Sequence, residues 1–178
     1  MHRFSVLVGD ITDSDAEAIV NAANETLLGG SGVDGAIHRA AGPELLEECR
    51  ALHGCPTGQA RLTRGYRLRA KYVLHTPGPV WRGGGSGEAA LLASCYRSCL
   101  ALASAHGIRS VDFPSISTGV FGYPVEQAAT VAERSIMDYL AEHPELEQVR
   151  MICHTESVAA VYRRTYNLWY AEDAAHRL

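Results

Sequence analysis

The segment with the clearest chemical potential is a glycine-rich loop that leads into a helix and carries an aspartate at the junction. It reads Gly-Gly-Ser-Gly-Val-Asp-Gly-Ala-Ile-His-Arg-Ala-Ala-Gly over residues 29–42. Its glycines leave backbone N–H groups open where the helix N-terminus is already electropositive. Such a loop can bind a phosphate group without a lysine. We therefore expect an anion-binding site here.

Asp34 in this loop needs a separate explanation, because a carboxylate beside a phosphate site repels the ligand. Two roles would account for it: Asp34 caps the helix, or it orients a water molecule for attack on the bound molecule. His38 follows one helical turn later, so its imidazole and the Asp34 carboxylate can meet on one face. A catalytic role for His38 competes with a packing role.

A second turn-rich loop, residues 114–124, follows an apolar strand and precedes a helix. Because ligands in open α/β sheets bind at the carboxyl ends of strands, the two loops can hold a diphosphate from both sides. The competing interpretation is that the glycines only permit tight turns. The predicted contributors are the hydroxyls of Ser117 and Thr118, the backbone N–H groups of residues 119–122, and the ring of Phe121 or Tyr123.

Three polar residues lie at or just after the ends of the first two predicted strands. Asp10 can accept a hydrogen bond from an exocyclic amine such as that of adenine, while the N–H of Ile11 serves a ring nitrogen; helix capping by Asp10 is the alternative. Asn24 is a candidate for binding sugar hydroxyls through its amide. For Asn21 we favour a simple turn-forming role. His75, which closes a predicted strand, and His154, which follows the last one, are each open to a functional and a structural interpretation.

Several activities are disfavoured by the motifs. Neither loop has the Gly-x-x-x-x-Gly-Lys-Ser/Thr pattern of ATP-binding loops, and no Gly-x-Gly-x-x-Gly array follows the first strand. No Gly-x-Ser-x-Gly elbow is present, so no covalent nucleophile is indicated. The five cysteines are an odd number without zinc-site spacing, and Cys95 and Cys99 fit a helix core better than a metal.

Composition and charge limit the partners and the location. A net charge of −4 and a pI near 6.0 argue against duplex nucleic acid as the main partner. The apolar run at the start is too short for a signal peptide, and no segment approaches a membrane span. We expect a protein without membrane partners in the reducing cytoplasm.

Strands and helices alternate along the chain, which predicts a layered α/β/α fold in a single domain covering residues 1–178. Apolar residues at consecutive strand positions indicate helices on both faces of the sheet. The expected strands are Phe4–Val8, Ala18–Ala22, Ala60–Thr63, Tyr72–His75, Ser110–Phe113 and Val149–Cys153. The expected helices are Val33–Ala41, Pro43–Leu52, Gly87–Ala105, Val125–Ala141 and Ser157–Tyr166. Residues 82–87 look like a flexible surface connection into a helix.

Taken together, these segments resemble the macrodomain family, from Gly9 to about Arg164. The order of the motifs is that of the family, and residues 33–42 look like the MacroD-type branch. Pro79-Val80-Trp81 and the following glycines look like its bacterial deacetylases. The motifs are Gly9-Asp10-Ile11-Thr12, Asn21-Ala22-Ala23-Asn24, residues 29–42, His75-Thr76-Pro77-Gly78-Pro79 and residues 117–124. The resemblance implies a three-layer fold around a mixed, mostly parallel sheet of about six strands.

The resemblance also assigns roles to the candidate residues. It implies that Asp10 and Ile11 hold adenine, that Asn24 positions the distal ribose, and that Asp34 orients or activates the hydrolytic water. The residues implied to wrap the diphosphate are Gly32, Val33, Ser117, Thr118, Gly119, Val120 and Phe121. Asp34 and Asn24 are thus the predicted catalytic residues, without a metal ion or a redox cofactor. A carboxylate at a helix N-terminus is favoured in its ionised form, which makes it a weak base but a good acceptor for a water proton.

Two positions depart from the family pattern. Ser31 replaces a glycine, which restricts the loop and adds a hydroxyl near the ribose. His154-Thr155-Glu156 replaces an aromatic-acidic run, so we expect His154 to stack on adenine.

We predict an enzyme that hydrolyses ADP-ribose esters, with O-acetyl-ADP-ribose and mono-ADP-ribosylated proteins as substrates. Nucleic acid is expected as a partner only where its ends carry ADP-ribose. The alternatives are a reader that binds ADP-ribose without cleaving it and, less favoured by the acidity, a protein that binds RNA in the same crevice.

Overall fold

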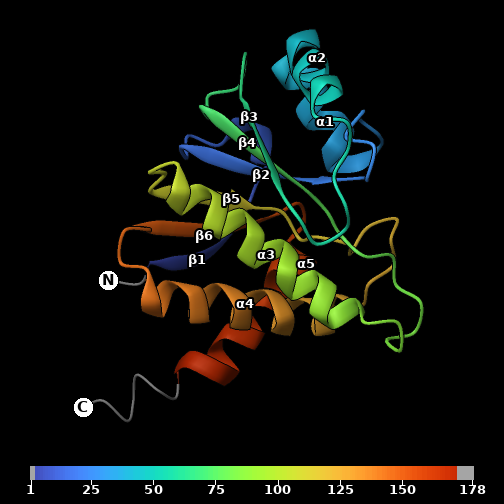
Figure 1. Cartoon of the computed structure of the whole chain (residues 1–178). Coiled ribbons are helices and arrows are strands. Elements are labelled where there is room, and N and C mark those ends of the chain that lie inside the picture. The colour runs from blue at the N-terminus through green and yellow to red at the C-terminus, as the bar shows by residue number, and fades with distance from the viewer. Residues whose placement is uncertain (1–2, 172–178) are drawn as a thin grey trace.

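In the computed structural model, which describes residues 3–171, six strands form one mixed sheet in the order β1-β6-β5-β2-β4-β3 (Figure 1). Neighbouring strands run parallel except at one edge, where β3 is antiparallel to β4. The strands are β1 (Phe4–Val8), β2 (Ala18–Ala23), β3 (Arg61–Arg64), β4 (Tyr72–Pro77), β5 (Ser110–Phe113) and β6 (Gln148–Cys153). The ends of the predicted domain, residues 1–2 and 172–178, lie outside the described residues.

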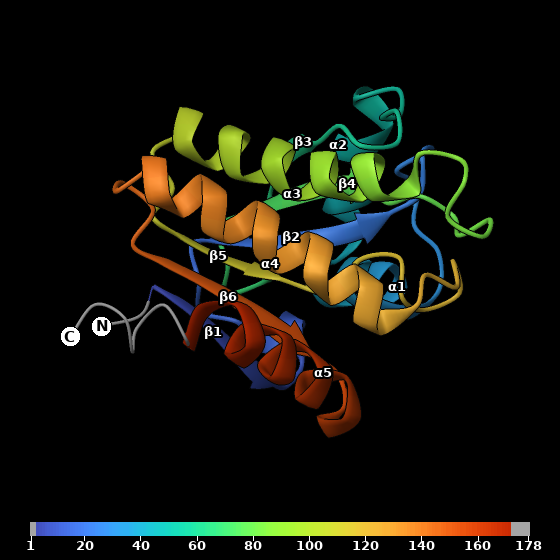
Figure 2. The ribbon, with the colours of Figure 1, turned by 90° about the horizontal axis from the view of Figure 1, so that it is seen from below.

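Helices cover both faces of this sheet, which confirms the predicted three layers. Helices α1 and α2 lie on one face, and α3, α4 and α5 lie side by side on the other (Figures 1 and 2). Their bounds are α1 (Gly32–Ala41), α2 (Pro43–Ala51), α3 (Glu88–Ala105), α4 (Val125–Glu142) and α5 (Glu156–Tyr166), with a short 3₁₀-helix η1 (Ile11–Asp13) and a π-helix η2 (Asn167–Ala171). Every predicted strand and helix overlaps an observed one.

Two hydrophobic clusters, one for each face, hold the layers together. Successive strand residues point to opposite faces, so Ile19 belongs to the cluster under α1 and α2 while Val20 belongs to the larger cluster under α3, α4 and α5. Cys95 and Cys99 are wholly buried in the larger cluster, which confirms their predicted packing role. The burial of both faces fixes the register of the strands and hence the positions of the loops that follow them.

One buried ion pair ties the connection between β1 and β2 to the sheet. Arg150 on β6 donates to the two carboxylate oxygens of Asp112 on β5 at 2.8 and 2.9 Å. Ser14, just after η1, donates to the same carboxylate at 2.6 Å. A buried carboxylate is tolerated only when it is paired in this way. The contact therefore anchors the segment that carries Asp10 and Ile11.

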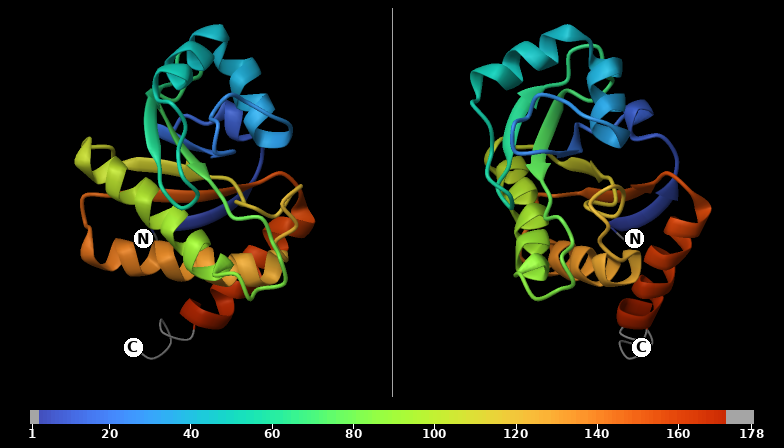
Figure 3. Two further views of the ribbon diagram at one scale, coloured as in Figure 1. Left: turned by 45° about the vertical axis from the view of Figure 1, so that its right-hand side comes forward. Right: turned by 90° about the vertical axis from the view of Figure 1, so that its right-hand side faces the viewer.

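All five parallel strands end at the same edge of the sheet, which the right-hand panel of Figure 3 faces. The segments that follow them there are residues 9–13 after β1, 24–31 after β2, 78–87 after β4, 114–124 after β5 and 154–155 after β6. Both glycine-containing loops that the sequence singles out are among them. The topology thus brings together the segments predicted to bind one ligand.

Candidate active site

Helix α1 begins at Gly32 in a way that leaves its first turn suited to an anion. Gly32 has a φ of +61°, which strongly favours glycine. Ser31 is the N-cap residue, yet its side chain makes no capping hydrogen bond. Among the described residues, the N-terminal N–H groups therefore have no capping side chain, as expected of a helix that binds a phosphate. Of the two roles considered for Asp34, helix capping is wrong, because Ser31 is the N-cap residue and Asp34 lies inside the first turn.

The Asp34 carboxylate is buried, with only 6% of the residue exposed. Its Oδ1 accepts a hydrogen bond from Asn21 Nδ2 at 2.9 Å, and His38 Nε2 lies 3.5 Å from the same oxygen. Burial raises the pKa of Asp34 above its ordinary value, while the Asn21 hydrogen bond and the nearby His38 oppose this rise. The predicted meeting of Asp34 and His38 is thus confirmed, and the carboxylate is partly desolvated.

The second oxygen of Asp34 and the amide of Asn24 both face Gly30. A Cβ atom at Gly30 would lie 3.0 Å from Asp34 Oδ2 and 3.5 Å from Asn24 Nδ2, so a side chain there would fill the space between them. Asn24 Nδ2 donates to the Gly29 carbonyl at 2.9 Å, and its Oδ1 accepts from the Thr26 N–H at 3.0 Å. These bonds fix the amide and, within the described chain, leave its second N–H for a ligand hydroxyl.

Asn21 has a different place from the one that we predicted. It lies within β2, wholly buried, and not in the turn that follows, so the turn-forming role is wrong. Besides its bond to Asp34, its Nδ2 lies 3.2 Å from Nδ1 of His75, its register partner on β4. A clue was present in the sequence, since an asparagine between Val20 and Ala22 in an apolar strand must find a buried partner.

The loop after β5 brings Ser117 into the same region. Ser117 has a φ of +67° and is 7% exposed, and its hydroxyl has no hydrogen-bond partner among the described residues. It packs so closely on Gly78 that a Cβ there would lie 2.2 Å from Ser117 Oγ. A strained serine with an unpartnered buried hydroxyl is what a ligand-binding loop is expected to hold.

Other donors of this loop are already used within it. The Thr118 hydroxyl donates to the Ser115 carbonyl at 3.1 Å, so Thr118 would serve a ligand through its backbone. The Gly122 N–H donates to the Gly119 carbonyl at 3.0 Å, which makes the predicted use of that N–H for a ligand wrong. Gly119 and Val120 are exposed at the tip of the loop, with 89% of Val120 accessible.

A hollow of about 350 Å³ opens between Asn24 and Phe121. Phe121 is therefore a better candidate than Tyr123 for the aromatic ring predicted to contact a sugar. Tyr123 is buried, with its ring centroid 4.6 Å from that of Trp81. The lining residues are Asn24, Glu25, Thr57, Pro77, Gly78, Pro79, Val80, Arg82, Ser86, Glu88, Leu91 and Phe121.

Glu88 at the start of α3 fixes the wall of this hollow, a role that sequence reasoning missed. Its buried carboxylate accepts backbone hydrogen bonds from Arg82, Gly84 and Ser86 at 3.0, 2.8 and 2.6 Å. These bonds lower the pKa of Glu88, the one from Arg82 most. The glycine-rich connection 82–87 is on the surface, as predicted, but these hydrogen bonds hold it against the start of α3.

The predicted adenine-binding residues meet where β1 and β6 end. Asp10 Oδ1 accepts from the Thr12 N–H at 2.9 Å and the Thr12 hydroxyl at 2.7 Å, so Asp10 does cap η1, and these bonds lower the pKa of Asp10. The Ile11 side chain is buried, which leaves only its backbone for a ligand. His154 is exposed next to the Gly9 N–H···O=C Cys153 bond that joins the two strand ends. Their contacts with adenine stay predictions.

Comparison with known proteins agrees with this geometry. The sequence model of the Macro domain matches residues 20–132 of the 178. The chain belongs to the macro domain family. A macro domain-containing protein of Chlorobaculum tepidum is 58% identical to it, covering 87% of this chain and 90% of its own. The O-acetyl-ADP-ribose deacetylase of Salmonella gallinarum is 53% identical, with 91% and 93% covered.

Among solved structures, the macrodomain of Oceanobacillus iheyensis with ADP superimposes with a TM-score of 0.90 at 40% identity, covering 94% of this chain and 91% of its own. The resemblance that the sequence motifs indicated is therefore confirmed for the family and for the fold.

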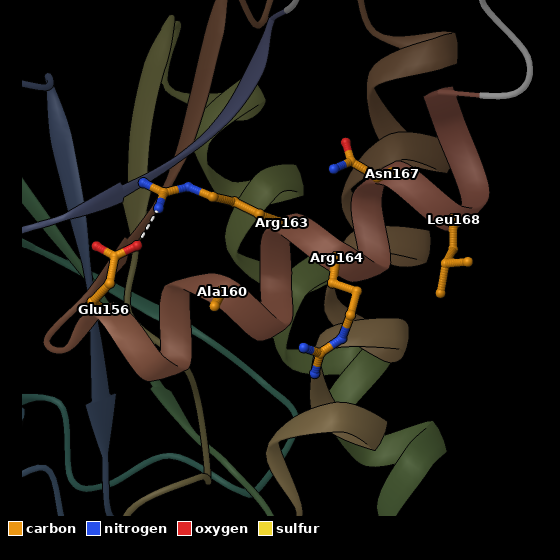
Figure 4. A pocket seen from close by; sticks show the side chains of 6 residues that line it. All are labelled: Glu156, Ala160, Arg163, Arg164, Asn167 and Leu168. Carbon is orange, nitrogen blue, oxygen red and sulfur yellow. Dashed lines mark hydrogen bonds and ion pairs between the residues drawn. The ribbon is translucent and has the colours of Figure 1, made fainter.

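A larger hollow of about 480 Å³ lies along α5 and the start of η2 of this macrodomain (Figure 4). Within it Arg163 donates to Glu156 at 2.7 Å, an exposed pair that contributes little to stability. Its lining residues are Glu156, Ala160, Arg163, Arg164, Asn167 and Leu168, none of them a predicted site residue. Over residues 3–171 there is no metal-ligand cluster of three or more His, Cys, Asp or Glu, and no helix long and apolar enough to cross a membrane.

Proposed function

We propose that this macrodomain hydrolyses the ester bond between ADP-ribose and a carboxylic acid, with O-acetyl-ADP-ribose and proteins mono-ADP-ribosylated on acidic side chains as substrates. One observation carries the proposal: the buried Asp34 carboxylate, whose Oδ2 faces Gly30 beside the Asn24 amide. A module that only binds ADP-ribose does not need a carboxylate at its phosphate loop, because the charge weakens binding. The deacetylase name of the Salmonella relative supports the same choice.

In this proposal the diphosphate lies between the first turn of α1 and the loop 117–121. The distal ribose then reaches Asn24, which donates its second N–H to a ribose hydroxyl. Asp34 Oδ2 accepts a proton from a water molecule, and the water oxygen attacks the acyl carbonyl carbon. The bond between the acyl carbon and the ribose oxygen breaks, the ribose oxygen takes the proton from Asp34, and the products are ADP-ribose and the free carboxylic acid. An ester needs less help to leave than an amide, so a weak base suffices, and a substrate phosphate can share its role.

The hollow beside Asn24 supports an acyl substrate, because it offers room next to the ribose position. Much of its lining is apolar, including Pro77, Pro79, Val80 and Leu91. Its two carboxylates are engaged: Glu88 by backbone N–H groups and Glu25 by the Thr57 hydroxyl at 3.1 Å. We place the acyl group of the ester there. A cytoplasmic location, proposed from the reduced cysteines, is consistent with substrates of this kind.

The test is to incubate the purified protein with O-acetyl-ADP-ribose and, separately, with a protein mono-ADP-ribosylated on glutamate, and to follow ADP-ribose release. Calorimetry with ADP-ribose runs in parallel. Release from both substrates is the expected result, and release from the acetyl ester alone would restrict the substrate class. Heat of binding without release from either substrate would overturn the hydrolase proposal in favour of a reader.

A further inference from the structure

A chain of hydrogen bonds runs under Asp34 across three neighbouring strands. Thr63 on β3, His75 on β4 and Asn21 on β2 are all wholly buried. Thr63 Oγ1 lies 2.9 Å from His75 Nε2, His75 Nδ1 lies 3.2 Å from Asn21 Nδ2, and Asn21 Nδ2 lies 2.9 Å from Asp34 Oδ1. This series of hydrogen bonds therefore connects the edge strand β3 with the Asp34 carboxylate.

The direction of these bonds follows from the first of them. The Thr63 hydroxyl donates to the Arg64 carbonyl at 3.1 Å, and with its only hydrogen in that bond Thr63 Oγ1 accepts from His75. His75 then carries its hydrogen on Nε2 and presents the lone pair of Nδ1 to Asn21. Burial lowers the pKa of His75 to about 3, so the ring stays neutral and keeps one lone pair.

The tautomer of His75 determines the orientation of the Asn21 amide. One N–H of Nδ2 is held by His75 Nδ1, and the other points at Asp34 Oδ1. If the amide were reversed, Asn21 Oδ1 would face both the lone pair of His75 and the Asp34 carboxylate, and both contacts would be repulsive. The tautomer of His75 thus decides whether Asp34 faces a donor or an acceptor.

We propose that Thr63, His75 and Asn21 form a positioning relay that keeps Asp34 ionised and aims its second oxygen at the Gly30–Asn24 space. The relay rests on the proposed function for its catalytic meaning. None of the three residues reaches the ligand loops through its own side chain, so all act through Asp34. The titratable groups packed around the relay are Asp34 and His38 on α1 and Glu48 and Cys49 on α2, with Cys49 Sγ 3.8 Å from His75 Nε2.

Two substitutions of Thr63 separate the relay from packing. Thr63→Val keeps the branched shape and removes the hydroxyl, which frees His75 to move its hydrogen to Nδ1. Thr63→Ser keeps the hydroxyl and loses a methyl group. We measure the pKa of Asp34 in the whole protein from its ¹³C carboxyl resonance. The expected result is a pKa raised by about one unit in Thr63→Val and unchanged in Thr63→Ser, with ADP-ribose affinity within about twofold in both.

Kinetics add a second readout. At pH values below the pKa of Asp34 we expect kcat for O-acetyl-ADP-ribose to fall about tenfold in Thr63→Val, because the acidic limb of its pH profile moves to higher pH by about one unit, with KM unchanged. Thr63→Ser should retain the wild-type profile. Equal effects of the two substitutions, or an Asp34 pKa that does not move in Thr63→Val, would overturn the relay.

A measurement on the unmodified protein covers the case in which Thr63→Val fails to fold. Long-range ¹H–¹⁵N spectra report which nitrogen of His75 carries the hydrogen. We expect Nε2–H between pH 5 and 8, and an Nδ1–H tautomer would overturn the relay. Because this readout and the Asp34 titration need no turnover, a wild-type protein without hydrolase activity would refute the proposed function and leave the relay separately testable.

Discussion

His38 Nε2 lies 3.5 Å from Asp34 Oδ1, one helical turn along α1, and this nitrogen has no hydrogen-bond partner among the described residues. The imidazole is 13% exposed, so it reaches the site without being open to bulk solvent. The pair places a second titratable group beside the carboxylate whose other oxygen, Oδ2, is proposed to accept the water proton. Substitution of His38 can therefore distinguish a catalytic role from a packing role.

We expect His38→Phe to lower kcat for O-acetyl-ADP-ribose about tenfold while ADP-ribose affinity changes little. The phenyl ring preserves packing against Gly29, but it can neither hydrogen-bond nor carry a charge beside Asp34. Steady-state kinetics with calorimetry check this, and His106→Phe, on the exposed end of α3, is the control. A wild-type kcat in His38→Phe would leave His38 with a packing role only.

Gly78→Ala should distort the loop that carries Ser117. The added Cβ would lie 2.2 Å from Ser117 Oγ and 2.6 Å from Ile116 Cγ2, too close for either atom to stay in place. We expect a stability loss of about 1–3 kcal/mol and ADP-ribose binding weakened about tenfold or more. Urea unfolding and calorimetry measure both effects.

The matched control for this change is Gly85→Ala, where an added Cβ meets nothing within 4 Å. It should leave stability and affinity near the wild type. If both alanine variants bound ADP-ribose equally well, the close contact between Gly78 and Ser117 would have no part in shaping the site.

The buried carboxyl of Glu133 should make the free energy of unfolding depend on pH, independently of the active site. It is wholly buried on α4, both carboxylate oxygens lack partners in the described chain, and burial raises its pKa to about 8 from 4.5. The folded state holds this proton up to about pH 8, and the unfolded chain releases it near 4.5, so the folded state binds more protons between these values. Its stabilising contribution is complete below pH 4.5 and is lost as pH rises to 8, by about 1.4 kcal/mol per pH unit.

Glu133→Gln removes this titration and should flatten the pH dependence of the free energy of unfolding between pH 5 and 8. Urea unfolding of both proteins at several pH values provides the comparison. Compared with the wild type, the variant should gain in free energy of unfolding as the pH rises from 5 to 8. Parallel curves for the two proteins would show that Glu133 is not held protonated by the fold.

The order of elements and the convergence of loops could be predicted from the sequence. Apolar strands and amphipathic helices alternate clearly, and parallel strands place the segments after Val8, Ala23 and Phe113 at one edge. Local capping at Asp10 and the approach of His38 to Asp34 follow from spacing along the chain alone. These are short-range relationships, and they were predicted correctly or kept as one of two alternatives.

Contacts between distant segments could not be predicted in this way. Thr63, His75 and Asn21 become neighbours only through strand register, and no spacing in the sequence fixes which residues of β2, β3 and β4 face one another. Glu88 was missed because its partners are backbone N–H groups, which carry no residue signature. The use of Gly122 N–H within its own loop likewise depends on the turn that the backbone adopts.

Asp34 is the residue on which the proposed hydrolysis depends most. The decisive measurement is single-turnover hydrolysis of O-acetyl-ADP-ribose by Asp34→Ala, with ADP-ribose affinity measured by calorimetry on the same preparation. We predict that hydrolysis falls about a hundredfold or more, while the Kd changes by less than about tenfold, or roughly 1.4 kcal/mol. Wild-type turnover by Asp34→Ala would contradict the proposed role of this carboxylate.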